Sequence, residues 1–239
     1  MARNTSGSSS TVNITGFGIE LGMKNAALWL LAAGRASFWL LARPSRYNFG
    51  LPMSSPLASA IADLSSGDPE MRFAAATEIY RRGRTPADRA VYAWWNNAEF
   101  AQLCGASPAV TVGLAVRRET FARIHEASGL PSLALVPPDQ DAEEFELQFP
   151  NDISLDVLTT RDPSGQGVIA RYLAKFGEGV QQVEFRCKNV DRAAQILKEN
   201  FGVQPIYPQT RAGAGDTRVN FFLVSSPNSA KVLIELYET

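Results

Sequence analysis

The chain has 239 residues, a formal net charge of −1 and 45% hydrophobic residues, which is the composition of an ordinary soluble globular protein. This length allows one sizeable core, or a core with a small addition. The near-neutral charge argues against a nucleic-acid partner. The two cysteines, Cys104 and Cys187, form no CxxC pattern, so a zinc knuckle or a dithiol redox motif has no support. Two unpaired buried thiols are a simpler interpretation than a disulfide, and they favour a cytoplasmic location.

Residues 1–52 are predicted to be a poorly ordered extension, because residues 1–13 are rich in Ser, Thr and Asn. Residues 26–42 are apolar, but this run is shorter than the roughly 20 residues of a spanning helix and contains Arg35. Three interpretations stay open: a membrane or surface anchor, an export signal, or a translated stretch upstream of a start at Met53, absent from the mature protein. We expect no membrane association unless residues 26–42 are an anchor.

Residues 53–106 are predicted to be a small helical segment. Asp68 precedes a proline at the start of an apolar periodic run, which is typical of a helix N-cap, and Gly83 is expected to end that helix. The segment is either a cap over one side of the following domain or an interaction module that docks a partner. Trp94 and Trp95 favour the cap, because adjacent tryptophans are more often core residues than ligand-stacking residues.

Residues 107–239 contain the same pattern of elements twice, in modules at 107–162 and 177–239. Each module reads as a strand, a helix, a Pro-flanked strand and two further strands. One such unit cannot bury its apolar face alone, so the two are expected to pack together. The predicted fold is α+β, with two βαβββ modules forming a curved mixed sheet around a cavity, preceded by the small helical segment. The Pro-flanked strands are expected at 133–136 and 203–207.

Alternation along the predicted strands separates an apolar face from a polar one. In the strand 217–224, the pattern sets Val219, Phe221 and Leu223 against Arg218, Asn220 and Phe222. Clustered carboxyl groups raise one another's pKa, which suits proton transfer or cation binding. A wet sheet face without any ligand is the alternative. The polar side chains expected to converge are Glu144, Glu146, Asp156, Glu184, Arg186 and Glu235.

Residues 108–239 resemble the vicinal oxygen chelate superfamily, which includes glyoxalases, bleomycin-resistance proteins and extradiol dioxygenases. They are most similar to members of the methylmalonyl-CoA epimerase type. The motifs that carry the resemblance are Gly177–Arg186, Val219–Leu223 and Lys231–Leu236, with support from Ile169–Phe176 and Val112–Val116. The resemblance implies paired βαβββ modules around a central cavity.

Metal-using members of that superfamily take four ligands from the first and last strands of the two modules. The resemblance places these positions at Thr111, Asp156, Gln182 and Glu235, where Glu235 alone keeps the usual residue type. Such a degenerate metal site offers oxygen donors, which suit Mg or Mn better than Zn, Fe or Ni. We therefore expect no cofactor, or at most a hard divalent cation. His125, the one histidine, lies on a predicted covering helix and cannot replace the missing imidazoles.

Three functions stay open. In the first, a glyoxalase-like protein binds a small molecule in the cavity between its modules, as bleomycin-resistance-type proteins do without catalysis. In the second, the protein is an isomerase or lyase resembling the epimerase. In the third, it is an interaction protein that uses residues 54–104. The resemblance allows either a monomer or a homodimer.

Residue roles follow from these hypotheses. As an isomerase or lyase, the protein is expected to use Glu235 as the base, with Glu144 or Glu146 as its catalytic partner. Arg186, Glu184 and Asn220 are the expected substrate-binding residues, and Arg186 is the candidate to stabilise an enolate.

Overall fold

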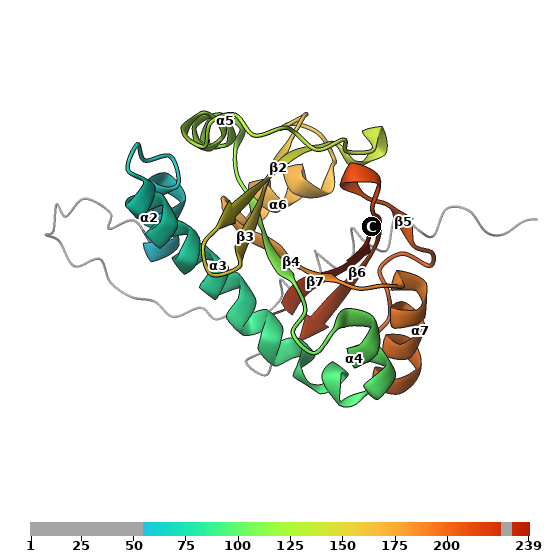
Figure 1. Cartoon of the computed structure of the whole chain (residues 1–239). Coiled ribbons are helices and arrows are strands. Elements are labelled where there is room, and N and C mark those ends of the chain that lie inside the picture. The colour runs from blue at the N-terminus through green and yellow to red at the C-terminus, as the bar shows by residue number, and fades with distance from the viewer. Residues whose placement is uncertain (1–54, 226–230) are drawn as a thin grey trace, which may run out of the picture. The chain divides into compact units, whose positions relative to one another are not determined.

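A computed structural model of the chain describes residues 55–225 and 231–239 (Figure 1). The predictions for residues 1–52, including a possible anchor at 26–42, lie outside the described residues. Within the described ranges, no helix combines the length and the apolar character needed to cross a bilayer.

The described chain folds into six α-helices and seven strands. The helices are α2 (Pro56–Asp63), α3 (Pro69–Val91), α4 (Ala98–Cys104), α5 (Arg118–Ala127), α6 (Val168–Phe176) and α7 (Val190–Phe201). The strands are β1 (Val110–Ala115), β2 (Ala142–Phe149), β3 (Ile153–Thr160), β4 (Gly179–Arg186), β5 (Arg211–Ala212), β6 (Arg218–Ser225) and β7 (Lys231–Glu238). Three short 3₁₀ turns lie at Tyr92–Asn96, Pro138–Gln140 and Ala214–Asp216.

All seven strands belong to one mixed sheet that curls into a half-barrel, in the order β2-β3-β1-β4-β7-β6-β5. The first and last strands of each module run parallel, β1 beside β3 and β4 beside β7. The modules meet where β1 pairs antiparallel with β4. This topology confirms the predicted α+β fold of two related modules.

The prediction of Pro-flanked strands at 133–136 and 203–207 was wrong. Residues 133–136 are extended but form no strand, and the Ala134 amide donates to the Glu144 carbonyl at 3.0 Å. Residues 203–207 form only an isolated bridge, Pro205 to Phe222. Pro205 interrupts the second segment and Pro131 and Pro137 flank the first, and a proline has no N–H to donate to a ladder. The short β5 takes the edge position instead.

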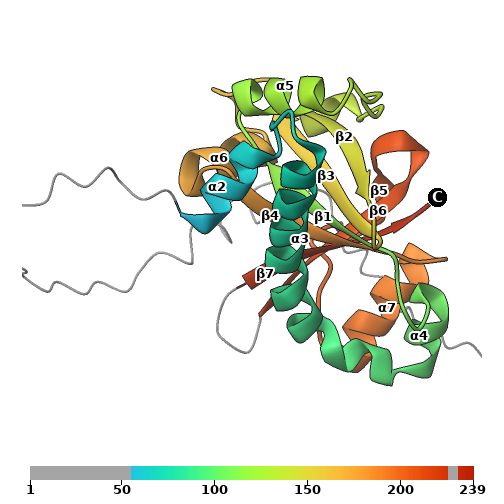
Figure 2. The ribbon, with the colours of Figure 1, turned by 60° about the vertical axis from the view of Figure 1, so that its left-hand side comes forward.

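One face of the sheet is apolar and is covered by α3, α5 and α7; we call it the helix-covered face. Figure 2 shows α3 lying across the sheet between α5 and α7. Gly83 does not end this helix, as was expected, because α3 continues through it to Val91. A Cβ atom on Gly83 would lie 2.6 Å from Cγ1 of Val112, so the glycine permits close helix–sheet contact.

The helical segment packs against the sheet with its tryptophans turned inward. Trp94 is 2% exposed and meets Phe222 edge to face. The Trp95 indole donates to the Gly105 carbonyl at 2.9 Å and packs against Phe185. These contacts have the character of the predicted cap, in which aromatic side chains complete the core of the following domain.

Candidate functional site

The opposite face of the sheet carries five carboxyl groups, and we call it the carboxyl face. Strand register brings them together in pairs: Glu146 lies beside Asp156 across β2 and β3, and Glu184 lies beside Glu235 across β4 and β7. Glu144 lies two residues before Glu146, on the same face of β2. The predicted alternation in β2 and β4 is therefore correct.

On the β4–β7 side, Gln182 joins two of these carboxyl groups. Its Nε2 donates to Oε2 of Glu235 at 2.7 Å and to Oε1 of Glu184 at 3.0 Å. Gln182 and Glu235 are each 8% exposed. The amide thus holds two carboxyl groups from neighbouring strands at a fixed separation, without supplying a charge.

On the β2–β3 side, a second hydrogen-bond group surrounds Glu146. Its Oε1 accepts from the Ser154 hydroxyl at 2.8 Å and from the Gln148 amide. The Thr111 hydroxyl extends this group to β1 by donating to Ser154 at 3.2 Å. Thr111, one of the family ligand positions, is thus engaged with Ser154 rather than with the other three.

Gly113 lies between the two groups, paired with Asp156 on one side and Gln182 on the other. A Cβ atom there would lie 2.5 Å from Cγ of Gln182, so any other residue would displace the bridging amide. Sequence reasoning missed this residue. A glycine inside an apolar strand is the signal that indicates a close approach, and it could have been used.

Four carboxyl groups of this face, Glu144, Asp156, Glu184 and Glu235, have raised pKa values. Burial raises the pKa of Glu144 to about 7, and burial followed by the charges of Glu144 and Glu146 raises that of Glu184 to about 7 as well. The pKa values of Asp156 and Glu235 lie well above the usual range, first through burial and then through neighbouring carboxylates. Burial thus favours the protonated form of all four groups, and neighbouring carboxylates add to this effect at Asp156, Glu184 and Glu235.

Arg186 lies at the end of β4, on the same face but exposed to solvent. Its Nη2 donates to the Thr239 hydroxyl at 3.1 Å. Within residues 55–225 and 231–239, none of the five carboxyl groups forms an ion pair with a basic side chain. The expected convergence of Arg186 with the acidic cluster is therefore only partial, since it stands at the rim.

Asn220 does not lie with these carboxyl groups, and its predicted role in binding substrate stays a prediction. It pairs with Leu236 in β7, on the helix-covered face, and is 2% exposed. Its Nδ2 donates to the Tyr207 carbonyl at 3.1 Å. The alternation in this strand is as predicted, but the two faces are exchanged. Phe221 lies beside Glu235 on the carboxyl face, and Phe222 packs under the helices. Both faces of β6 carry apolar residues, so alternation could not choose between them.

The four family ligand positions share the carboxyl face, but they do not fit a metal as they stand. Gln182 presents its donor nitrogen to Glu235, and Thr111 is bonded to Ser154. Across the described residues, no group of three or more acidic, histidine or cysteine side chains gathers closely enough to bind an ion. His125 lies on α5 with Nε2 2.7 Å from the Pro131 carbonyl, and its ring packs against Phe145 on the helix-covered face.

One end of the carboxyl face is closed by α6. A small apolar cluster there combines Leu173 of α6 with Leu158 of β3 and Val136 of the extended segment. Beside it, the two modules meet along a seam, where the Gly215 amide donates to the Leu135 carbonyl at 3.1 Å and the Gln140 amide donates to the Ala212 carbonyl at 2.8 Å. The seam brings the two edges of the half-barrel together at this end.

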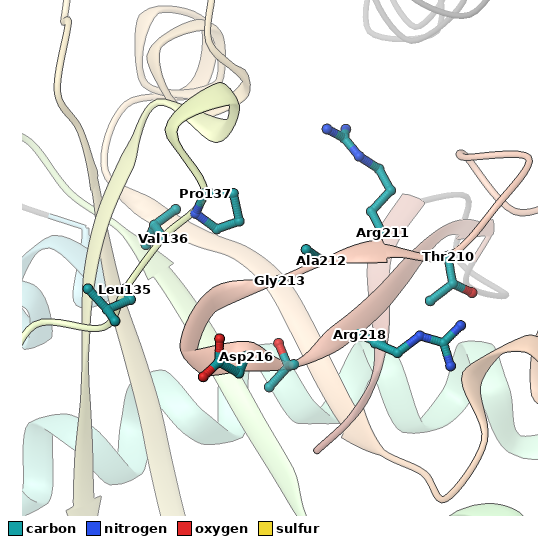
Figure 3. A pocket seen from close by; sticks show the side chains of 10 residues that line it. Leu135, Val136, Pro137, Thr210, Arg211, Ala212, Gly213, Asp216 and Arg218 are labelled. Carbon is teal, nitrogen blue, oxygen red and sulfur yellow. The ribbon is translucent and has the colours of Figure 1, made fainter.

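A pocket of about 470 Å³ opens at this seam (Figure 3). Leu135, Val136 and Pro137 form one wall, and residues 210–213 and 216–218 form the other. Its two arginines are engaged: Arg211 pairs with Asp139, and Arg218 pairs with Asp191 and Glu238. The pocket does not include any of the five carboxyl groups.

The chain was compared with known proteins. No family model and no curated protein matches it. A methylmalonyl-CoA epimerase from Mycobacterium tuberculosis is similar at 30% identity, over 54% of this chain and 85% of that one, with a TM-score of 0.44. A hypothetical protein from Bacillus halodurans is similar at 26% identity, over 54% and 91% of the two chains, with a TM-score of 0.44.

A third similar structure is a variant of Streptomyces coelicolor methylmalonyl-CoA epimerase in complex with 2-nitronate-propionyl-CoA. It shares 22% identity over 56% of this chain and 97% of that chain, with a TM-score of 0.45. The fold assignment stands on the strand order and register.

Proposed function

We propose that this chain is a member of the vicinal oxygen chelate superfamily whose carboxyl face binds a small molecule with a positive charge. The supporting observation is the set of five carboxyl groups on one curved face, without an ion pair from any basic side chain of the described residues. Moving a cation into that set offsets the repulsion between carboxylates that, after burial, contributes to the raised pKa values of Asp156, Glu184 and Glu235.

An extended organic cation suits the site better than a metal ion. The carboxyl groups are spread over four strands, β2, β3, β4 and β7, and do not converge on one point. A polyamine places charges several ångströms apart, so each ammonium group can meet a separate carboxylate. The degenerate ligand set at Thr111, Asp156, Gln182 and Glu235 then belongs to the binding surface and not to a metal centre.

Thermal unfolding at pH 7 tests this proposal with spermidine, Mn²⁺ and Mg²⁺ as probes, at matched ionic strength. Spermidine is expected to raise the melting temperature more than either metal, because a ligand of the folded state stabilises it by mass action. The shift should be lost in Glu184→Gln and in Glu235→Gln. Glu126→Gln is the matched control, since Glu126 is exposed on α5, outside the carboxyl face. Equal shifts in all variants would reject the proposal.

The release of protons when spermidine binds is an independent test of the same proposal. Binding a cation lowers the pKa of a carboxyl group that titrates near 7, so protons should leave the protein as spermidine binds. Calorimetry in two buffers of different ionisation enthalpy measures the number of protons released for each spermidine bound. Release that is greatest between pH 6 and pH 8 supports the role of Glu144 and Glu184, and binding without proton release contradicts it.

A second candidate function is proton transfer, in which the protein is an isomerase. The observation that favours it is the Glu184–Glu235 pair held by Gln182, in which burial raises the pKa of both carboxyl groups. The pair then supplies an acid and a base for proton transfer, with Glu235 as the expected base. A protonated Glu235 can also donate a hydrogen bond to an enolate, the role expected for Arg186.

Deuterium exchange distinguishes this second function from simple binding. Methylmalonyl-CoA, the compound that the similar epimerases act on by name, is the probe, and incorporation of deuterium at its α-carbon is followed by mass spectrometry in D₂O. Incorporation that disappears in both Glu184→Gln and Glu235→Gln, but persists in Glu126→Gln, supports proton transfer. Absence of incorporation by the wild-type protein rejects it for this probe.

A further inference from the structure

The chain's two cysteines come together where the helical segment meets the sheet. Cys104 is the last residue of α4, and Cys187 follows the last residue of β4. The Lys188 amide donates to the Leu103 carbonyl at 2.9 Å, which places the adjacent cysteines side by side. Both side chains belong to the same core cluster, and each thiol perturbs the pKa of the other.

We propose that Cys104 and Cys187 are an oxidation site, at which hydrogen peroxide forms a disulfide that ties α4 to the end of β4. Both thiols are reduced in this structure, and they are 6% and 4% exposed. Cys104 ends α4 two residues before the exposed Ala106, and Cys187 follows β4 and precedes the exposed Lys188, so a small oxidant needs only a local opening to reach them.

The two sulfurs have different chemical roles. The hydrogen bond from Cys104 and the backbone amide of Asn189 lower the pKa of Cys187, although burial opposes them. Hydrogen bonding to Cys187 and burial raise the pKa of Cys104 far above its usual range. Since the thiolate is the nucleophile, Cys187 is the sulfur that meets the oxidant and Cys104 is the one that resolves the product.

The reaction balances in two steps. The Cys187 thiolate attacks one peroxide oxygen, the O–O bond breaks, and the leaving hydroxide takes a proton to become water. The sulfur of Cys104 then gives up its proton and attacks the resulting Cys187 sulfenic acid. The S–O bond breaks, the S–S bond forms, and a second water leaves. Two thiols are oxidised by two electrons, and one peroxide is reduced.

The cross-link joins the cap to the sheet at one defined place. It closes a loop of about 80 residues, and a disulfide across a long loop stabilises the folded state. The Arg192–Glu99 ion pair, at 2.6 Å, links α4 to α7 at the same corner. Oxidation is therefore expected to fix α4 without moving the carboxyl face, which lies on the other side of the sheet.

Peptide mapping of the full chain tests the proposal directly. The protein is treated with hydrogen peroxide, free thiols are alkylated, and the digest is analysed without reduction. We expect a linked peptide that joins Cys104 to Cys187, and a melting temperature raised by about 5–15 °C that dithiothreitol reverses. A folded protein that yields no linked peptide after peroxide treatment overturns the proposal.

Single variants test the order of events. In Cys104→Ala, peroxide should carry Cys187 on to the sulfinic acid, because the resolving thiol is gone. In Cys187→Ala, Cys104 should stay reduced in the same time. Circular dichroism before treatment verifies that each variant is folded. Oxidation of Cys104 in the second variant at the rate of the wild-type pair contradicts the assigned roles.

Discussion

The two faces of the sheet are made by alternate residues of the same strands, yet they have opposite energetics. Phe185 is 1% exposed and packs under Trp95, whereas Glu184, its neighbour, faces the carboxyl groups of three other strands. Burial stabilises the phenylalanine and destabilises the ionised glutamate. The comparison indicates that the helix-covered face supplies the stability that the carboxyl face reduces at neutral pH, a division typical of functional sites.

The largest effect is expected from the helix-covered face. Replacing Phe185 with alanine should lower the free energy of unfolding by about 3–5 kcal/mol, because a buried aromatic side chain is lost and a cavity remains. Urea denaturation measures the change. A loss below about 1 kcal/mol would contradict the account of this face, because such a small value is typical of surface positions.

Replacing the neighbouring Glu184 with glutamine should have the opposite sign. The pKa of Glu184 is about 7 in the folded protein, against 4.5 as the ordinary value. Stability that is fully present below pH 4.5 is therefore lost as the pH rises through about 7, because the unfolded chain ionises first. At pH 8 the variant should be more stable by about 2–3 kcal/mol, and at pH 4 it should match the wild type.

Urea titrations between pH 4 and pH 8 measure this dependence. Glu126→Gln is the control, and its pH profile should follow that of the wild type because Glu126 is exposed on α5. If Glu184→Gln is less stable than the wild type at pH 8, the carboxyl face is not a site of unrelieved repulsion.

A smaller loss is expected at the contact between α3 and the sheet. Gly83→Ala places a methyl group 2.6 Å from Val112, so the helix must shift, at a cost of about 1–3 kcal/mol. The higher helix propensity of alanine offsets part of this cost, by less than about 1 kcal/mol. Gly67→Ala is the matched control, because nothing lies within 4 Å of its Cβ position. Stabilisation of the Gly83 variant would show that α3 is not held this closely.

The smallest effect is expected at Asn220, and it sharpens the division between the faces. Asn220→Ala removes the hydrogen bond to the Tyr207 carbonyl and should cost about 1–2 kcal/mol. Its response to spermidine should equal that of the wild type, since Asn220 lies on the helix-covered face. A variant that folds normally but loses the spermidine response would place Asn220 in the binding site after all.

The sequence allowed the paired modules and the acidic face to be predicted, because β2 and β4 alternate cleanly between apolar and charged residues. The prediction failed in β6, where apolar and charged residues do not alternate. In β6, Phe221 and Phe222 are both aromatic, and the polar residue Asn220 is buried to satisfy a backbone carbonyl. The role of Gly113 depends on a contact between β1 and β4, which no local pattern reports.

The continuation of α3 through Gly83 and Pro86 also lay beyond local signals. Both residues usually interrupt helices, and each favoured a boundary. Tertiary contact overrides that preference here, because the glycine lies against Val112 of the sheet and Ala87 is fully buried. The predicted poorly ordered extension at residues 1–52 stays a prediction.

The central claim is that Glu144, Asp156, Glu184 and Glu235 are held protonated, or partly so, at neutral pH by burial, to which repulsion between carboxylates adds at the last three. Carbon-13 NMR of the side-chain carboxyl groups between pH 4 and pH 9 tests it most directly. The account predicts midpoints near 7 for Glu144 and Glu184, midpoints above the ordinary range for Asp156 and Glu235, and a downward shift when spermidine is added. Midpoints near the ordinary value of 4.5 for both Glu144 and Glu184 would contradict it.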